Sequence, residues 1–369
     1  MPRRSAAPRP PGAARPATPA TPAFAERVQR WQRTQGRHHL PWQGTRDPYR
    51  VWLSEVMLQQ TQVATVLVYY GRFLERFPTV QDLAAAPLAD VLGLWSGLGY
   101  YGRARNLHRA AQAVVAEYGG RFPATAAGLQ ALPGIGRSTA AAIAAFCFGE
   151  RAAILDGNVK RVLARALGFD GDLASAPETA RLWALAESLL PHQGIESYTQ
   201  GLMDLGAGIC LARAPRCDAC PLATDCIACA QGRPEAYPVK TRTRARGARF
   251  SAWLWLQSRE RLWLVQRPER GIWAGLWSLP EFDTVDDARA ELAALPGEPQ
   301  PQPPFVHVLT HLDWTLQPLH WPLPERPPRA LDALLAARWP QGRWVAMTDA
   351  LSLGIPAPLR RLLLDATAG

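Results

Sequence analysis

The sequence predicts a multidomain protein in which a large all-α domain precedes a smaller α+β domain. Apolar residues recur at helical spacing from Phe24 to about residue 230. A proline- and glycine-rich turn at 132–136 interrupts this pattern, and from Phe250 it changes to short strands. With 369 residues and 48% hydrophobic content, the chain is long enough to bury a core in each domain.

Two basic segments mark the expected domain boundaries. Of the formal net charge of +10, residues 1–23 contribute +4 and residues 231–249 contribute +5. The first segment has little to bury and predicts a disordered tail; an organellar transit peptide is the alternative, which its prolines weaken. The second predicts a flexible linker between domains at 24–230 and 250–366. Because the excess charge lies in these segments, bulk charge alone does not establish nucleic-acid binding.

The second domain is expected to be built from short strands and helices. Strands are predicted at 250–257, 262–266, 306–312 and 314–319, and helices at 284–295, 329–338 and 358–365. No apolar run approaches the roughly 20 residues of a membrane helix, and no secretory segment follows the start. We therefore expect a soluble, intracellular protein.

The turn at 132–136 predicts a helix-hairpin-helix. Pro133 stops a helix-like run, Gly134 and Gly136 can take positive φ, and Ser138 can restart the helix. The exposed amides of the second helix would then hold a phosphate oxygen without reading a base. An ordinary capped helical turn is the alternative.

Two acidic residues stand in informative contexts. Asp156 follows an apolar run and precedes a helix-like segment at 159–167, where an aspartate alone indicates an N-cap. Glu55 lies in a helical stretch whose spacing places Trp52, Leu58 and Gln59 beside it. Partial desolvation there would raise the pKa of Glu55 and favour a general acid, whereas a solvated helix face is the alternative.

Further along, a glycine-rich segment at 94–106 presents two adjacent tyrosines. Tyr100 or Tyr101 at such a tip is suited to unstack a base pair, although packing into the core is the alternative.

Four cysteines within seventeen residues indicate a metal site. The spacing is Cys210-x6-Cys217-x2-Cys220-x5-Cys226, and four soft thiolates in one loop suit a [4Fe–4S] cluster. A four-cysteine zinc site is the main competitor. Cys147 and Cys229 lie outside the pattern, and six unevenly placed cysteines do not suit a secreted disulfide framework.

Together these motifs resemble the helix-hairpin-helix DNA glycosylases and, within them, the adenine DNA glycosylases of the MutY family. The resemblance of residues 24–230 rests on Leu-Pro-Trp, Ser-Glu-Val-Met-Leu-Gln-Gln-Thr-Gln-Val, Gly-Leu-Gly-Tyr-Tyr, the hairpin with Leu-Asp-Gly-Asn-Val-Lys-Arg-Val, and the cysteine spacing of loop 210–226. Residues 250–366 resemble that family's Nudix-like recognition domain.

The resemblance implies a role for each candidate residue. Glu55 would protonate a ring nitrogen of a flipped adenine, and Asp156 would stabilise the oxocarbenium-like sugar. The remaining implied assignments are the wedge, Gln60 and Tyr100; the adenine pocket, Arg37, Trp42, Gln200 and Asp204; further DNA-binding positions, Gly134, Gly136, Ser138 and Lys160; and a [4Fe–4S] cluster on the four cysteines, placing Arg213 and Arg216 on DNA.

Ser138 separates two reaction types within this superfamily. In bifunctional relatives the position is a lysine that attacks the sugar and leads to strand cleavage, which a serine cannot do. The resemblance therefore implies a monofunctional glycosylase that leaves an abasic site. An endonuclease III-like glycosylase acting on oxidised pyrimidines such as thymine glycol is the alternative, disfavoured by Ser138 and by the second domain.

The second domain is expected to recognise 8-oxoguanine opposite the adenine. The family's Phe-Ser-His loop appears here as Leu309-Thr310-His311, which keeps a hydroxyl and a ring donor and loses the aromatic contact. The implied partner is double-stranded DNA with A:8-oxoguanine or A:G mispairs, bound by a monomer in a bacterial cytoplasm, at the nucleoid.

Two rival functions are weaker. A Nudix pyrophosphatase needs an Arg-Glu-x2-Glu-Glu box to hold magnesium, whereas residues 282–298 contain Asp283, Asp286, Asp287 and Glu291 but no such box. A non-catalytic DNA-binding module is disfavoured by the presence of both Glu55 and Asp156 in their motif contexts.

Overall fold

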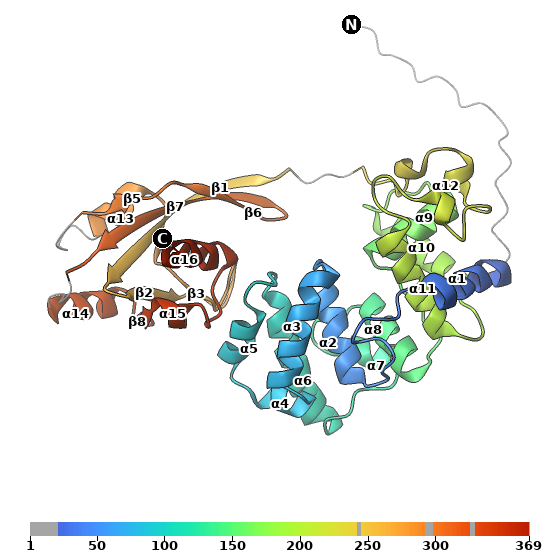
Figure 1. Ribbon diagram of the computed structural model, residues 1–369, viewed down its shortest axis with the longest axis horizontal. Helices are drawn as coiled ribbons and strands as arrows, with labels where there is room; N and C mark the ends of the chain where they lie inside the picture. The colour runs from blue at the N-terminus through green and yellow to red at the C-terminus, as the bar shows by residue number, and fades with distance from the viewer. Residues whose placement is uncertain (1–20, 242–244, 292–297, 325–328, 369) are drawn as a thin grey trace, which may run out of the picture. The chain divides into compact units, whose positions relative to one another are not determined.

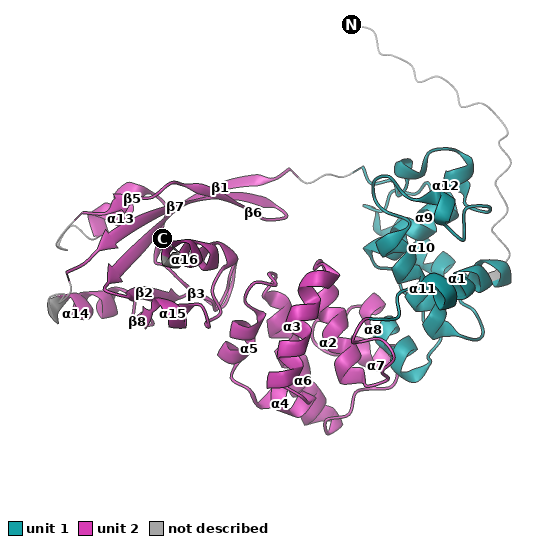
Figure 2. Cartoon of the chain, viewed as in Figure 1, with its two compact units in different colours: residues 1–39, 140–242 teal, residues 40–139, 243–369 magenta. Residues whose placement is uncertain are grey.

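The computed structural model describes residues 21–241, 245–291, 298–324 and 329–368. The chain forms two compact units, and both are discontinuous in sequence (Figure 2). Unit 1 comprises residues 1–39 and 140–242, and unit 2 comprises residues 40–139 and 243–369. These units cut across the predicted all-α domain. Most of the predicted tail lies outside the described residues, and residues 21–23 already belong to the first helix.

Unit 1 is helical. Buried apolar residues such as Val28 on α1 (Thr21–Gln35) and Leu202 on α11 (Ile195–Gly208) form its core. A Cβ on Gly201 would lie 2.7 Å from the Val28 side chain, so the glycine lets α1 and α11 approach closely. Its helices are α1 (Thr21–Gln35), a π-helix (Ala144–Phe148), α9 (Gly157–Ala166), α10 (Ala176–Ser188), α11 (Ile195–Gly208) and α12 (Ile227–Ala230), with short 3-10 turns at Cys217–Ala219 and Pro234–Ala236.

The segment 231–249, predicted to be a flexible linker, is structured at both of its ends. The buried Arg165 donates from Nε to the carbonyl oxygens of Pro234 (2.7 Å) and Tyr237 (3.2 Å). The amide of Leu173 bonds to the carbonyl of Val239 at 3.0 Å. Residues up to 241 therefore pack on unit 1, and strand β1 already begins at Gly247.

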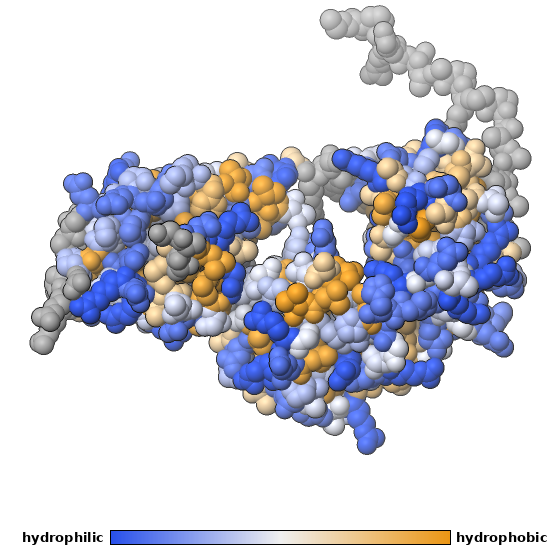
Figure 3. Space-filling view, viewed as in Figure 1, coloured by the Kyte–Doolittle hydropathy of each residue, from blue (hydrophilic) through white to orange (hydrophobic). Residues whose placement is uncertain are grey.

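The helical part of unit 2 packs around large aromatic side chains. Phe73 contacts Phe77 and Trp95 edge to face, with centroids 5.2 and 6.0 Å away. The helices are α2 (Pro48–Leu58), α3 (Val63–Arg76), α4 (Val80–Ala85), α5 (Leu88–Trp95), α6 (Gly102–Tyr118), α7 (Ala126–Gln130) and α8 (Arg137–Ile143), the last of which crosses into unit 1. On the face drawn in Figure 3, hydrophilic residues cover most of both units and apolar residues gather over the α2 and α3 region.

The rest of unit 2 is a mixed sheet with helices (Figure 1). Strands β1 and β7 form its parallel centre, in register from Gly247 opposite Leu312 to Gln257 opposite Pro322. The strands are β1 (Gly247–Ser258), β2 (Arg261–Gln266), β3 (Trp277–Ser278), β4 (Glu281–Phe282), β5 (Gln300–Pro301), β6 (Phe305–Val308), β7 (Leu312–Pro322) and β8 (Arg343–Ala346). The helices are α13 (Val285–Glu291), α14 (Arg329–Arg338), α15 (Met347–Ala350) and α16 (Ala357–Ala368).

Side chains of β1 alternate between two apolar clusters. Trp253 lies in one cluster with Leu359 of α16, whereas Leu254 lies in another with Leu335 of α14. The expected strand at 306–312 instead ends at Val308 and turns through 309–311 before β7 begins. The expected helix at 284–295 is described only to Glu291, because residues 292–295 lie outside the described residues.

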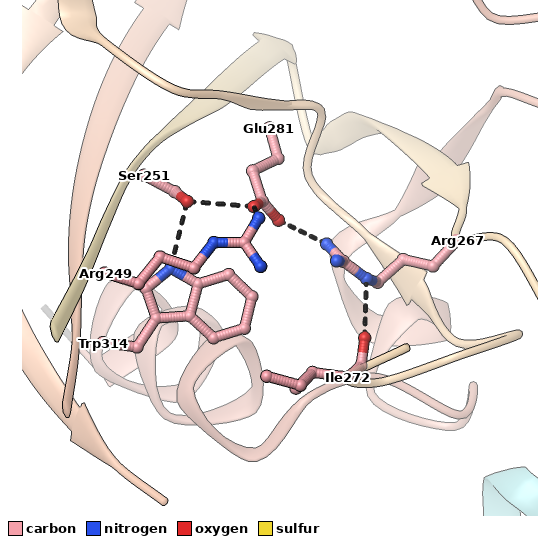
Figure 4. A network of polar contacts seen from close by, with 6 residues as sticks. All are labelled: Arg249, Ser251, Arg267, Ile272, Glu281 and Trp314. Carbon is pink, nitrogen blue, oxygen red and sulfur yellow. Dashed lines mark hydrogen bonds and ion pairs between the residues drawn. The ribbon is translucent and has the colours of Figure 1, made fainter. Parts of the chain in front are cut away.

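A polar network ties three strands of this sheet together (Figure 4). Glu281 on β4 accepts hydrogen bonds from Ser251 Oγ (2.9 Å) and Arg249 (2.6 Å), and it also pairs with Arg267. Trp314 on β7 donates from Nε1 to Ser251 Oγ at 3.0 Å. Two guanidinium groups thus pair with the largely buried Glu281 carboxylate and compensate its charge.

Within unit 2 the sheet also contacts the helical part. Tyr101 donates its hydroxyl to the Ile355 carbonyl at 2.6 Å, and Arg105 bonds to the Ala274 carbonyl at 2.6 Å. The glycine-rich segment at 94–106 therefore contacts residues of the sheet-containing part, such as Ala274 and Ile355, that lie more than 150 positions later in the chain. In the part of the chain that the structure describes, no helix is both long and apolar enough to span a bilayer.

Candidate active site

Glu55 lies on the last full turn of α2. Asp47 caps the start of this helix by accepting from the Tyr49 amide at 2.9 Å, and Pro48 occupies its first position. Glu55 is half-buried, and the preceding turn contributes the fully buried Trp52. At the C-cap, Gln59 donates from Nε2 to Thr139 Oγ1 at 3.3 Å, which joins the end of this helix to α8.

The predicted hairpin connects α7 to α8, with two differences from expectation. Gly134 takes a positive φ of 76°, and a Cβ there would lie 2.5 Å from the Asn106 side chain, so glycine is required. Gly136 does not take a positive φ, and a Cβ there would meet only open space. Helix α8 begins at Arg137, which places Ser138 within its first turn rather than at its cap.

Asp156 caps the start of α9. Its Oδ1 accepts from the Val159 amide at 2.7 Å, and its own carbonyl accepts from the Lys160 amide at 2.8 Å. The side chain is half-buried, and Lys160 is half-buried one turn further on. A Cβ on Gly206 would lie 2.6 Å from Asn158, so α11 packs directly against the helix start that carries Asp156. The N-cap geometry is thus present and leaves the carboxylate partly open.

Three of the four expected pocket residues meet in unit 1. The Asp204 carboxylate, only 1% exposed, accepts from the backbone amide of Arg37 (3.0 Å) and from its guanidinium (2.7 and 2.8 Å). Gln200 donates from Nε2 to the same carboxylate at 2.9 Å. Trp42 belongs to unit 2, where it is buried with its ring 5.3 Å from Tyr70.

The two expected wedge residues share an unusual backbone. Gln60 has a φ of 59° and Tyr100 a φ of 50°, in the left-handed region that favours glycine. Both side chains are exposed, Tyr100 by 52%. Each therefore projects from a strained turn, which requires surrounding contacts to hold it.

Arg103 supplies such contacts, because its guanidinium donates to the Gln59 and Gly99 carbonyls beside these two residues. The sequence motifs gave Arg103 no role.

The loop at 309–311 contacts one of these wedge residues. The Tyr100 hydroxyl lies 3.1 Å from Thr310 Oγ1, within hydrogen-bond distance. The loop is closed by the Leu309 amide, which donates to the Leu312 carbonyl at 2.8 Å. Leu309 packs partly against the core, whereas Thr310 and His311 are exposed. One of the two expected wedge residues, Tyr100, thus meets the expected lesion loop within unit 2.

Five cysteines line one small cavity in unit 1. Cys229, expected to lie outside the pattern, joins the predicted four: Cys210, Cys217, Cys220 and Cys226. Burial, followed by the neighbouring thiols, raises the pKa of Cys217 to about 11. Burial likewise raises the pKa of Cys220 to about 12. Crowded thiols of this kind become thiolates only beside a positive centre, so the donor set suits a thiolate-bound metal group.

The arrangement around these cysteines has two further features. Arg165 donates to Cys210 Sγ at 3.4 Å, which ties the cysteine cavity to α9. Among the residues described, no three acidic, histidine or cysteine side chains are arranged to hold a single metal ion. Cys147 is buried on the π-helix Ala144–Phe148 and does not line this cavity.

Family models match both parts of the chain. Residues 53–187 match the HhH-GPD superfamily of base excision DNA repair proteins, and residues 252–365 match the NUDIX domain.

Two relatives of the chain are adenine DNA glycosylases. The chain is 40% identical over 258 residues to an adenine DNA glycosylase of Buchnera aphidicola, covering 70% of this chain and 74% of the relative. It is 36% identical over 369 residues to the adenine DNA glycosylase of Rattus norvegicus, covering 83% and 71%. A solved thermostable thymine-DNA glycosylase is similar to 57% of the chain over 97% of its own length, with a TM-score of 0.51 and 30% identity.

Proposed function

The chain belongs to the adenine DNA glycosylase family, enzymes that excise adenine from DNA in base-excision repair, and we propose that it removes adenine paired with 8-oxoguanine or guanine. The observation that carries this proposal is the contact between Tyr100 and Thr310. It joins a side chain suited to opening the adenine's base pair to a loop suited to reading the opposite base. Such an enzyme examines both bases of the pair before it acts.

In the proposed reaction, Glu55 donates a proton to a ring nitrogen of the flipped adenine. The C1′–N9 bond then breaks with its electron pair on adenine, which leaves as a neutral base. Asp156 stabilises the positive charge that develops on the sugar, and water adds to C1′ while releasing the balancing proton. The buried apolar neighbours of Glu55 and the partly open carboxylate of Asp156 support these roles.

Recognition of adenine is assigned to Arg37, Trp42, Gln200 and Asp204. Asp204 holds the Arg37 guanidinium and the Gln200 amide in fixed positions. The Gln200 oxygen and the remaining guanidinium donors then offer the mixture of acceptor and donor that an adenine edge requires. Trp42 offers a flat apolar surface suited to stacking.

The product is proposed to be an intact abasic strand. Ser138 stands where lyase chemistry requires a lysine, and lysine occurs in the chain only at Lys160 and Lys240. Gly134, Gly136, Ser138 and Lys160 are assigned to the DNA backbone, for which the open space beside Gly136 leaves room. Strand nicking without alkali would contradict monofunctional action, and Lys160→Arg would then identify the amine responsible.

We assign a [4Fe–4S] cluster to Cys210, Cys217, Cys220 and Cys226. When bound, the cluster would supply a positive centre that holds four thiolates and fixes the surrounding loop. That loop carries Arg213 and Arg216, which would meet phosphate. Iron and sulfide analysis of the purified chain tests this: about four irons per chain is expected, and stoichiometric zinc would contradict it.

Single-turnover assays on three duplexes test the function as a whole. We expect fast adenine release opposite 8-oxoguanine, slower release opposite guanine and no release of thymine glycol. Release of thymine glycol in preference to adenine would instead support the oxidised-pyrimidine alternative. We also propose that the enzyme acts as a monomer at the nucleoid of a bacterial cytoplasm, and light scattering of the chain with and without duplex checks its oligomeric state.

A further inference from the structure

We propose that Arg103 is a positioning residue that sets both wedge turns, at Gln60 and at Tyr100, and so controls opening of the base pair. The inference rests on the proposed wedge function of those two residues. Arg103 lies at the start of α6, three positions after Tyr100. None of the sequence motifs assigned it a role, because most of its hydrogen-bond partners lie more than 40 positions earlier in the chain.

On one side, the Arg103 guanidinium holds the turn that contains Gln60. Its Nη1 donates to the carbonyl oxygens of Val56 (3.0 Å), Met57 (2.9 Å) and Gln59 (2.6 Å). These carbonyls end α2 and have no partner within that helix. Its Nη2 bonds to Thr61 Oγ1 at 3.1 Å, just beyond the turn. Arg103 therefore brackets Gln60 on both sides.

On the other side, the same guanidinium holds the turn that contains Tyr100. Its Nη2 donates to the carbonyl oxygens of Leu98 (3.1 Å) and Gly99 (3.2 Å). It also lies over two rings, 5.3 Å from the centroid of Trp95 and 5.5 Å from that of Tyr100. The Gly99 carbonyl is fixed as well by Trp95 Nε1 at 3.0 Å.

These contacts hold Gln60 and Tyr100 in their strained backbone conformations. A non-glycine residue at positive φ persists only where its surroundings impose that conformation. The Arg103 side chain makes no ion pair with an acid in the described part of the chain; its partners are backbone carbonyls, one hydroxyl and two aromatic faces. Burial lowers its pKa to about 10. The desolvated Arg103 guanidinium therefore holds the backbone of the two turns in place.

Lysine cannot replace this arrangement. Arginine presents its donors as a planar fork that reaches several carbonyls at once, whereas lysine has three donors on one nitrogen. Arg103→Lys keeps the positive charge but loses the fork. Arg72→Lys on α3 is the matched control, because Arg72 is exposed and its guanidinium lies only over the Tyr69 ring.

The experiment uses the full chain and a duplex with 2-aminopurine opposite 8-oxoguanine, whose fluorescence reports base opening. Single-turnover release from the matching adenine duplex is measured in parallel. We expect Arg103→Lys to reduce both opening and release by about tenfold or more, with duplex affinity changed less than about threefold. Arg72→Lys should match the wild type. Thr61→Ala, which removes one Arg103 partner, should reduce opening by about threefold.

A triple variant separates a positioning role of Arg103 from a role in general stability. If Arg103 acts through the turns, Arg103→Lys should add little to the loss already caused by Gln60→Ala with Tyr100→Ala. Losses that multiply, together with a lower melting temperature and weaker duplex binding, would show a structural role and overturn the inference. Wild-type opening by Arg103→Lys, while Gln60→Ala and Tyr100→Ala lose theirs, would overturn it and leave the proposed function intact. Unchanged opening in Gln60→Ala and Tyr100→Ala would overturn the wedge function itself.

Discussion

The two compact units hold their candidate functional groups in different ways. In unit 1, Asp156 sits at a regular helix start and Asp204 is saturated by Arg37 and Gln200. In unit 2, Gln60 and Tyr100 stand on left-handed turns that a single guanidinium holds. Unit 1 thus relies on ordinary helix geometry, whereas unit 2 relies on strain imposed by contacts between distant segments.

This difference matches the proposed division of work. Stabilising a cationic sugar and recognising adenine require fixed charges and donors, which capped helices and saturated carboxylates provide. Opening a base pair requires side chains that project from the surface, which tight turns provide. We therefore expect unit 1 residues to affect chemistry and base recognition, and the turns of unit 2 to affect opening.

The largest loss of activity is expected at Glu55. This acid belongs to unit 2 but lies on a regular helix, unlike the two wedge residues of that unit. Glu55→Gln keeps the size of the side chain but removes the proton donor. We expect adenine release to fall by about 10²–10⁴-fold with duplex affinity retained, since proton transfer to the leaving base is lost. Single-turnover assays and duplex titration measure the two quantities, and release at the wild-type rate would remove Glu55 from the mechanism.

A slightly smaller loss of adenine release is expected at Asp156 in unit 1. Substitution by asparagine separates its role as a helix cap from its proposed role in catalysis. Asparagine caps a helix about as well as aspartate, so Asp156→Asn should leave the melting temperature unchanged. Release should nevertheless fall by about 10²–10³-fold, because the charge beside the sugar is gone. Thermal melts and single-turnover rates check this together. Equal rates for wild type and Asp156→Asn would leave Asp156 as a cap only.

Asp204→Asn tests whether the saturated cluster of unit 1 positions the adenine pocket. The buried amide would turn its N–H groups toward the donors of Arg37 and Gln200. We expect a loss of about 2–4 kcal/mol in the free energy of unfolding, because a buried charged pair is broken. Release should fall by about tenfold. Urea unfolding and single-turnover assays measure these effects, with Asp225→Asn, an exposed partner of Arg27, as the control.

The smallest effect concerns the lesion loop of unit 2. Thr310→Ala removes the hydroxyl that meets Tyr100, whereas Thr310→Ser keeps it. A single exposed hydrogen bond contributes about 1 kcal/mol, so the preference for 8-oxoguanine over guanine should fall by about three- to tenfold in Thr310→Ala. Parallel release assays on the two duplexes provide the ratio. The same ratio in both variants would exclude Thr310 from lesion recognition.

The sequence was most informative where function coincides with regular structure. The sequence predicts Asp156 as a cap because an aspartate before a helix is visible in the chain, whereas its proposed catalytic role came only from the family resemblance. The hairpin was equally visible, although the sequence did not show that only Gly134 needs a positive φ. The strands β1, β2 and β7 followed from their apolar patterns.

What the sequence missed depends on contacts between distant residues. Arg103 bonds mostly to backbone carbonyls, which carry no residue-specific signal. Cys229 was set apart by its spacing, yet α12 brings it back to the same cavity as the other four cysteines. The stretch 231–241 belongs to the segment 231–249 that was predicted to be a linker because it is basic, whereas Arg165 fixes this stretch to unit 1.

The central claim is that Glu55 protonates the departing adenine and that Asp156 stabilises the positive charge on the sugar. The most direct test is a crystal structure of the chain on a duplex in which a cationic pyrrolidine replaces the adenosine sugar opposite 8-oxoguanine. We predict the Asp156 carboxylate within about 3–4 Å of the pyrrolidinium nitrogen and Glu55 on the side of the departed base. A pyrrolidinium bound by another carboxylate, such as Asp204, or lying far from Glu55, would contradict the mechanism.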